Sequence, residues 1–248
     1  MNTFSLSQKN ALITGASRRL GAAFARALAA ADCSVVLHYN HSAKDAEALA
    51  SEIRAQGGKA SCIQADLAEP AQVESLIPRA VAQSGPLDIL INNASIFRET
   101  DFSETTASSL QENIAVHATA PLLLSRAFAA QQRCGAILNM VDARIADYDQ
   151  QHVPYHLSKR MLADLTRIMA VEFAPRIRVN GIAPGLILPP EGKDETYLKG
   201  LAHTNLLQSF GAAQDIVDAG LYLLCAAFVT GEILYVDGGR NLRGKMYD

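Results

Sequence analysis

A tyrosine and a lysine stand four residues apart in the segment Tyr155-His156-Leu157-Ser158-Lys159. In a helix this spacing places both side chains on one face. There the ammonium group would lower the pKa of the phenol and orient a cofactor ribose, while the phenol exchanges a proton with a substrate. Because such a pair is common by chance, its interpretation depends on the motifs around it.

A glycine-containing loop near the N-terminus could bind phosphate. It reads Thr14-Gly15-Ala16-Ser17-Arg18-Arg19-Leu20-Gly21 and joins an apolar run to a segment of helical period. Gly15 would let the backbone turn, and the start of a helix offers N–H groups and a positive dipole to a pyrophosphate. We therefore expect a dinucleotide cofactor here, bound by Gly15, Ser17, Arg18, Arg19 and Leu20.

The end of the second apolar run indicates which dinucleotide binds. Rossmann domains that select NAD usually carry an acidic residue at this position for the ribose 2′-hydroxyl. This chain has Tyr39 there, followed by the hydrogen-bond donors of Asn40, His41 and Ser42. Together with Arg18 and Arg19, these donors favour a 2′-phosphate and therefore NADP. The alternative is that the two arginines are merely solvated.

Two further segments fit the same cofactor. Asp66 and Leu67 follow the third apolar run, where the Asp66 carboxylate could accept a hydrogen bond from the adenine amino group. Asn93, Ala94 and Ser95 follow the fourth run, and their small side chains would let the backbone approach the dinucleotide. Both segments are therefore expected to line the cofactor site.

Apolar runs of strand length alternate with longer segments of helical period along the whole chain. This order predicts one α/β domain over residues 1–248, with a Rossmann-type, doubly wound parallel sheet of about seven strands and helices on both faces. The expected strands are Asn10–Thr14, Ser34–His38, Ala60–Gln64, Ile89–Asn92, Ala136–Val141, Arg178–Ile182 and Ile233–Val236. The expected helices are Leu20–Ala31, Ala43–Gln56, Gln72–Gln83, Leu110–Gln131, Tyr155–Phe173 and Ala213–Leu224.

Residues 184–205 form one long stretch that contains prolines and glycines and fits no regular period. It follows the carboxyl end of an expected strand, the side on which open α/β sheets bind ligands. Long irregular segments in compact domains are usually functional or disordered. We therefore expect a substrate-binding loop here rather than a passive surface loop.

Composition argues against several other classes of protein. A hydrophobic fraction of 49% and a net charge of -3 describe a globular chain with no general attraction to nucleic acid or anionic membranes. The four cysteines form no C-x-x-C pair and the six histidines show no ligand spacing, so we expect no disulfide and no metal, with His41 alone among the histidines near a site. Without a signal-peptide pattern or an apolar stretch long enough to span a bilayer, the expected location is the cytoplasm.

The order of these motifs resembles the short-chain dehydrogenase/reductase family over essentially the whole chain. T-G-x-x-x-x-x-G, D-L, N-N-A, a mid-chain asparagine at Asn113, Y-x-x-x-K, Pro184-Gly185 and Val236-Asp237-Gly238-Gly239 follow in family order. The resemblance implies that Tyr155 donates the proton, that Lys159 is its partner and that Asn113 holds a water-linked proton relay. It also implies a homotetramer and cofactor contacts from Pro184, Gly185 and Leu186.

Two departures from the usual family pattern resemble one subgroup, the pteridine reductases. Arg19 stands where most members carry glycine, and Asp142 stands where most carry serine, thirteen residues before Tyr155. Asn-Ala-Ser before an aromatic residue at Phe97 is a further feature of that subgroup. By this resemblance Phe97 stacks a flat bicyclic ring against the nicotinamide, and the substrate-binding residues are Ser95, Phe97, Asp142 and Tyr155.

The carboxylate of Asp142 has a physical rationale. Beside Tyr155 it would raise the pKa of the phenol, opposing Lys159, and so keep the phenol protonated. A protonated phenol suits a reductase that must deliver a proton to a ring nitrogen. The alternative is that Asp142 is an inactivating change.

We therefore expect NADPH-dependent reduction of an oxidised or dihydro pterin. One alternative is a reductase of the same family that acts on another carbonyl, such as a 3-oxoacyl thioester or a quinone, and Arg19 and Asp142 argue against it. An enoyl-thioester reductase would space its tyrosine and lysine more widely. The alternative of another class is a non-catalytic NADP-binding redox sensor, which would not need both Tyr155 and Lys159.

Overall fold

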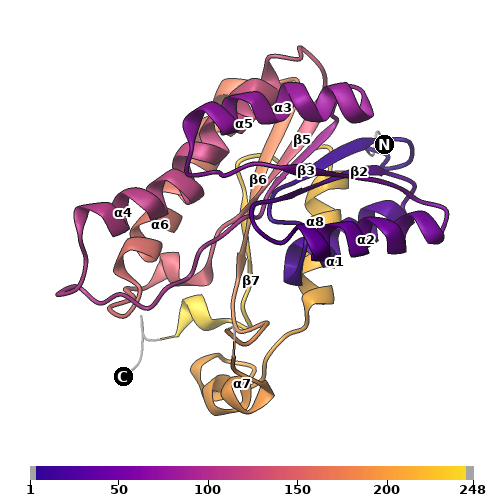
Figure 1. Cartoon of the computed structure of the whole chain (residues 1–248). Coiled ribbons are helices and arrows are strands. Elements are labelled where there is room, and N and C mark those ends of the chain that lie inside the picture. Colours follow the sequence, from indigo (N-terminus) through magenta and orange to yellow (C-terminus); the bar gives the residue numbers. More distant parts are fainter. Residues whose placement is uncertain (1–3, 191, 244–248) are drawn as a thin grey trace.

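The computed structural model describes residues 4–190 and 192–243, and within them seven parallel strands form one sheet in the order β3-β2-β1-β4-β5-β6-β7 (Figure 1). This is the predicted Rossmann-type fold, and every expected strand lies within two residues of its predicted bounds. The strands are β1 Asn10–Ile13, β2 Ser34–Tyr39, β3 Lys59–Gln64, β4 Ile89–Asn92, β5 Gly135–Met140, β6 Ile177–Pro184 and β7 Ile233–Val236.

Helices cover both faces of the sheet because successive residues of each strand point to opposite sides. Ile13 belongs to the core shared with α1 (Arg19–Ala30), α2 (Ala43–Ala55) and α8 (Ala213–Cys225). Its neighbour Leu12 belongs to the core shared with α3 (Pro70–Ser84), α5 (Ala120–Ala129) and α6 (Val153–Phe173). Figure 1 shows the two layers, with α1, α2 and α8 on one side and α3 and α5 on the other.

The strand order places the ligand-binding edge. The chain leaves β1 toward β2 on one side, whereas β4 pairs with β1 on the other side. In such sheets ligands bind beyond the carboxyl ends of the strands at this reversal of order. The segments that follow β1 and β4, which hold Gly15 and Asn93, therefore meet at one place.

The expected continuous helix Leu110–Gln131 is interrupted. The structure has α4 (Ala107–Ile114), a π-helical turn η1 (Ala115–Thr119) and then α5. Pro121 explains the break, since it has no N–H to donate to the carbonyl of His117, four residues earlier. The chain widens instead, and the Ala120 N–H reaches the Ala115 carbonyl.

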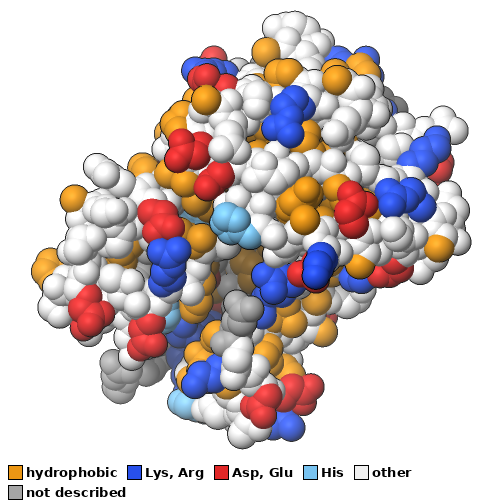
Figure 2. Space-filling model, viewed as in Figure 1, with side chains coloured by type: hydrophobic (Ala, Val, Ile, Leu, Met, Phe, Trp, Pro, Cys, Tyr) orange, Lys and Arg blue, Asp and Glu red, His pale blue; other side chains and the backbone are white. Residues whose placement is uncertain are grey.

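The stretch 184–205 is also more regular than expected. It contains the helix α7 (Glu195–Leu201) and a 3₁₀ turn η3 (Ala202–Thr204), and the Asp194 carboxylate caps α7 by accepting from the Thr196 N–H. Figure 1 places α7 away from the sheet, at the bottom of the view. Figure 2 shows a hollow between this part and the body of the molecule.

Among the described residues, no helix combines the length and the apolar character needed to cross a membrane.

Candidate active site

The loop after β1 leaves room for a ligand by packing backbone against backbone. Gly15 has a φ of +62°, and a Cβ there would lie 2.8 Å from the Cα of Ala94. A Cβ on Gly21 would lie 2.2 Å from the Gly15 carbonyl oxygen. Only glycine fits at either position, so the loop can curl tightly over the start of α1.

Two side chains that sequence reasoning left out hold this loop in place. The Thr14 hydroxyl oxygen accepts hydrogen bonds from the N–H groups of Asn93 at 2.9 Å and Ala94 at 3.0 Å. The His38 Nδ1 accepts from the Gly15 N–H at 3.1 Å, so its Nε2 donates to the Ala65 carbonyl at 3.0 Å. Burial lowers the pKa of His38 to about 4, which keeps this acceptor available at neutral pH.

The start of α1 fits a pyrophosphate group. Its N-cap residue, Arg18, makes no side-chain capping bond, and its first turn holds no acidic residue. The first N–H groups of the helix are therefore available to an anion. Arg19 has a φ of +55°, in the region that favours glycine, and its guanidinium donates to the Pro189 carbonyl at 2.8 Å. This bond links the glycine loop to the segment after β6.

Two of the residues predicted to bind the 2′-phosphate, Arg18 and Ser42, are in contact beyond the end of β2, whereas Arg19 contacts Pro189. The Arg18 guanidinium donates to the Ser42 hydroxyl at 3.2 Å, and the Asn40 side chain lies within 3.5 Å of the Gln64 amide. A carboxylate that sequence reasoning overlooked, Asp45, lies 3.5 Å from Arg18. Asp45 belongs to the first turn of α2 rather than to the strand end, where Tyr39 stands.

The remaining predicted cofactor residues lie along the same edge of the sheet. The Asp66 carboxylate accepts from the Ala68 N–H at 2.9 Å, and Leu67 is buried. Pro184 ends β6, and the backbone of the next two residues is hydrogen-bonded. The Gly185 N–H donates to the Val236 carbonyl, and the Leu186 carbonyl accepts from the Gly211 N–H.

Tyr155, Lys159 and Asp142 lie together in the structure. The Tyr155 hydroxyl donates to the Asp142 carboxylate at 2.7 Å. Lys159 is buried, and its ammonium donates to the Met140 carbonyl at 2.6 Å. Burial, and then the charge of Asp142, raise the pKa of the phenol well above its ordinary value. Lys159 does not lower it on balance, so the phenol is a protonated donor.

The same burial acts in the opposite sense on the lysine. It lowers the pKa of Lys159 to about 8, while the Asp142 carboxylate partly offsets the shift. The ammonium is therefore still charged at pH 7. Asp142 can serve both groups because it is fixed: its other carboxylate oxygen accepts from the Arg144 N–H at 2.8 Å, at the start of the 3₁₀ turn η2 (Ala143–Ala146).

Phe97 lies beside the phenol. Its ring meets the Tyr155 ring edge-on, with centroids 4.8 Å apart, and is stacked against the His152 ring at 4.2 Å. His152 is held in turn by Asp149 and Arg144. Burial opposes ionisation of Asp149, but hydrogen bonds from His152 and the Arg144 guanidinium outweigh it and lower the pKa of that carboxyl. The Phe97 ring, which is 41% exposed, is thus held in place by His152, which is itself held by Asp149 and Arg144.

The expectation that His41 is the one histidine near the site is wrong. Three others lie there: His38 under the glycine loop, His152 behind Phe97, and His117 against the Tyr155 ring at a centroid distance of 5.3 Å. Each contacts residues far away in the sequence, which is why spacing alone did not find it.

Asn113 is not joined to the other predicted catalytic residues by any hydrogen bond in the described structure. Its side-chain amide donates to the Ser109 carbonyl one turn earlier, and its Oδ1 is buried without a partner. Its predicted role in a water-linked proton relay stays a prediction. Across the residues that the structure describes, no cluster of His, Cys, Asp and Glu is arranged to hold a metal ion.

Comparison with known proteins gives the family. A family model described as enoyl-(acyl carrier protein) reductase matches residues 15–241. The chain is 34% identical over 280 residues to pteridine reductase 1 of Leishmania tarentolae, covering 94% of this chain and 96% of that protein. It is 33% identical over 247 residues to the 3-oxoacyl-(acyl-carrier-protein) reductase of Staphylococcus aureus, covering 93% and 97%.

A solved structure is similar to this chain in both fold and sequence. FolM alternative dihydrofolate reductase 1 from Brucella canis, complexed with NADP, superposes with a TM-score of 0.92 at 32% identity, covering 98% of both chains. The motifs, the sheet order and these relatives agree. The chain belongs to the short-chain dehydrogenase/reductase family of oxidoreductases.

Proposed function

We propose that the protein reduces an oxidised or dihydro pterin with NADPH. The observation that carries the proposal is the 2.7 Å hydrogen bond between Tyr155 and Asp142, next to the half-exposed ring of Phe97. It combines a phenol held protonated with a flat apolar surface beside it. That combination suits a planar heterocycle that must receive a proton at a ring nitrogen.

The residues divide the work between binding and proton transfer. Bound NADPH would supply the hydride, as nicotinamide cofactors do. The glycine loop and the start of α1 would hold its pyrophosphate. Phe97 would hold the substrate ring parallel to its own, and Tyr155 would donate the proton from Oη. In the structure that proton is donated to the Asp142 carboxylate, so it would have to turn from Asp142 to the substrate nitrogen, and the Lys159 ammonium would stabilise the phenolate left behind.

NADP selectivity is supported by the gathering of Arg18, Ser42 and Asn40 beyond β2, and by the NADP complex of the Brucella relative. Asp45 already neutralises part of the Arg18 charge. A bound 2′-phosphate would therefore share the guanidinium with a carboxylate. The free energy of this contact is expected to lie at the low end of the range for charge-assisted hydrogen bonds.

Arg18→Ala should weaken NADPH binding about tenfold and leave NADH binding nearly unchanged. A hydrogen bond to a charged group is worth about 1.5–3 kcal/mol, and the exposure of Arg18 favours the lower figure. The measurement is kcat/KM for each cofactor in the native chain and the variant. Arg26→Ala, which removes an arginine of α1 paired with Glu52, is the matched control. Equal kcat/KM for NADPH and NADH in the native chain would contradict the proposed selectivity for NADPH.

A reductase of 3-oxoacyl thioesters is the main rival, since a relative with that name is as similar as the pteridine reductase. A substrate panel at fixed NADPH separates the two. It should contain a dihydropterin, a dihydrofolate, an acetoacetyl thioester and an aromatic quinone. We expect the highest kcat/KM with the pterins. A higher value with the thioester would replace the pterin proposal by its rival.

Phe97→Ala should raise KM for the dihydropterin about tenfold and change kcat little. Stacking a heterocyclic base on an aromatic side chain is worth about 1–3 kcal/mol by alanine substitution, and one face of Phe97 is already stacked on His152. The KM for an acyl thioester, which has no flat ring, should move much less. Phe102→Ala is the matched control, because that ring follows in the same segment and lies exposed. Equal changes in KM for both substrates would remove Phe97 as a stacking surface.

A further inference from the structure

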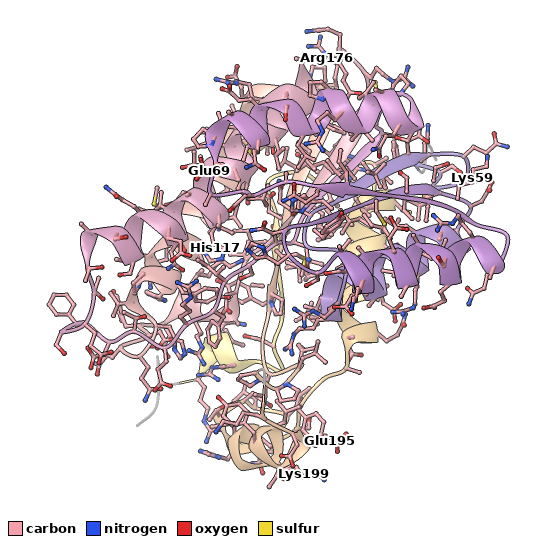
Figure 3. The ribbon with its side chains drawn as sticks, viewed as in Figure 1. Lys59, Glu69, His117, Arg176, Glu195 and Lys199 are labelled. Carbon is pink, nitrogen blue, oxygen red and sulfur yellow. The ribbon has the colours of Figure 1, made fainter. Side chains whose placement is uncertain are left out.

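His117 occupies the centre of the site although the motifs assign it no role. It lies in η1, the π-helical turn set up by Pro121, and is only 1% exposed. Figure 3 labels it in the middle of the molecule, well away from Glu195 and Lys199 on α7. Its ring contacts two parts of the site: the helix α6, through the Tyr155 ring and Ser158, and the segment after β4, through Ile96.

The hydrogen bonds determine which nitrogen carries the proton. The Ile96 N–H donates to Nε2 at 3.1 Å, so this nitrogen must be the acceptor. The proton is then on Nδ1, which donates to the Ser158 hydroxyl at 2.8 Å. Ser158 in turn donates to the Tyr155 carbonyl at 2.7 Å. Every donor in this series of hydrogen bonds has an acceptor, which is what buried polar groups require.

A charged ring would break this arrangement. With a proton on both nitrogens, Nε2–H would face the Ile96 N–H across the present hydrogen bond. Burial, and then the nearby Lys159 ammonium, lower the pKa of His117 well below its ordinary value. The ring therefore stays neutral where the enzyme works.

The Ser95 hydroxyl lies against the same nitrogen. It is 3.0 Å from Nε2 and 3.4 Å from the Ile96 carbonyl. Because the one lone pair of Nε2 already accepts from the Ile96 N–H, the Ile96 carbonyl is the acceptor left for the Ser95 proton.

We propose that His117 is a positioning residue for the reduction: bonded at both ring nitrogens, it fixes the backbone of Tyr155 through Ser158 and the wall Ser95–Phe97 through Ile96. Its Nε2 therefore acts on substrate binding and its Nδ1 on the proton donor. Asn113, one turn earlier, is bonded to Ser109 and reaches neither side. The inference rests on the proposed role of Tyr155 but not on the identity of the substrate.

Three substitutions separate the effect of Nδ1 on the proton donor from the effect of Nε2 on substrate binding. His117→Leu removes the hydrogen bonds of both ring nitrogens. It should lower kcat and raise KM, each about tenfold, as expected when a buried partner loses its hydrogen bond. The amide of His117→Asn reaches only as far as Nδ1, so it should restore most of kcat but leave KM high. The longer His117→Gln reaches the position of Nε2 and should restore KM but leave kcat low.

A purely structural role predicts a different pattern. Thr166→Val, on α6, removes two buried hydrogen bonds, to Leu162 and from Asn139, and is the matched control for lost stability. It should lower the thermal midpoint without changing kcat or KM. If the three His117 variants behave in the same way, or if Asn and Gln restore the same parameter, the proposal is overturned. Should His117→Leu fail to fold, the contrast between Asn and Gln still decides.

The experiment also distinguishes this inference from the proposed function. Kinetics are measured with whichever substrate of the panel the native enzyme reduces, so a failure with pterins leaves the His117 test intact. Independently of any substrate, ¹⁵N NMR of the native protein should show a neutral His117 protonated at Nδ1. A ring protonated at Nε2, or at both nitrogens, would refute the assignment.

Discussion

Tyr155→Phe is expected to bind NADPH normally and to lose its turnover. The substitution keeps the ring that packs against Phe97 and His117 and removes the hydroxyl, and with it the transferable proton and the hydrogen bond to Asp142. General acid catalysis contributes a factor of about 10² to 10⁴, and we expect kcat to fall within that range. The measurement is kcat at saturating NADPH and substrate, together with the Kd of NADPH from fluorescence titration.

A matched control distinguishes loss of the proton donor from loss of a hydroxyl. Tyr148→Phe removes an exposed phenol, and its kcat should match the native value. Lys159→Ala should differ from both, since it should weaken NADPH binding as well as slow the reaction. If Tyr155→Phe kept most of the native kcat, another group must donate the proton.

The sheet was predictable from the sequence because its signals are local. A short apolar run, such as the one that contains Leu12 and Ile13, and a turn residue such as Gly15 lie within a few positions of one another. The pair Tyr155 and Lys159 is likewise local to one helix. Asp142 could be found because it departs from a pattern at a fixed distance from Tyr155.

What was missed depends on contacts between distant segments. His117 meets Ser95 22 residues before it and Ser158 41 residues after it, and His38 meets Gly15 across 23 residues. No period connects such positions. One signal was available: Pro121, four residues after His117, predicts a broken helix at that point. By contrast, Asn113 was assigned from the order of the family motifs, and its side-chain amide donates within its own helix.

The helix α7 was missed for a different reason. The prolines and glycines at the start of the stretch made all of 184–205 look irregular, although Asp194 before Glu195 and Thr196 is a typical helix start. The consequence is functional. The Arg19 contact with Pro189 ties this segment to the glycine loop, so a helix-bearing segment rather than a plain loop adjoins the cofactor site.

Asp142→Ser is expected to lower kcat for the dihydropterin up to about a hundredfold while the Kd of NADPH stays within a few-fold. The variant removes the acceptor 2.7 Å from the Tyr155 hydroxyl and the negative charge beside it. Hydrogen bonds to charged groups are worth about 1.5–3 kcal/mol, which sets the size of the effect. The glycine loop that binds the cofactor lies on other segments and is not altered.

The pH dependence of kcat should change in a determined direction. The active phenol is the protonated one, so activity is present below the pKa of Tyr155 and is lost as the pH rises through it. Burial and the Asp142 charge both raise that pKa, and Asp142 also raises the pKa of Lys159. Without the carboxylate both values fall, and the alkaline limb of kcat should move to lower pH.

Asp142→Asn separates the charge from the hydrogen bond. Its amide oxygen can still accept from the Tyr155 hydroxyl but carries no charge, so the alkaline limb should move as in Asp142→Ser. Its kcat at neutral pH should nevertheless fall less, because the phenol is still oriented. Phe97→Ala is the control in the other direction, since it should raise KM without moving the limb. If neither Asp142 variant moved the limb or slowed dihydropterin reduction, the carboxylate would have no part in the reaction. Reduction of another carbonyl would then become the better proposal.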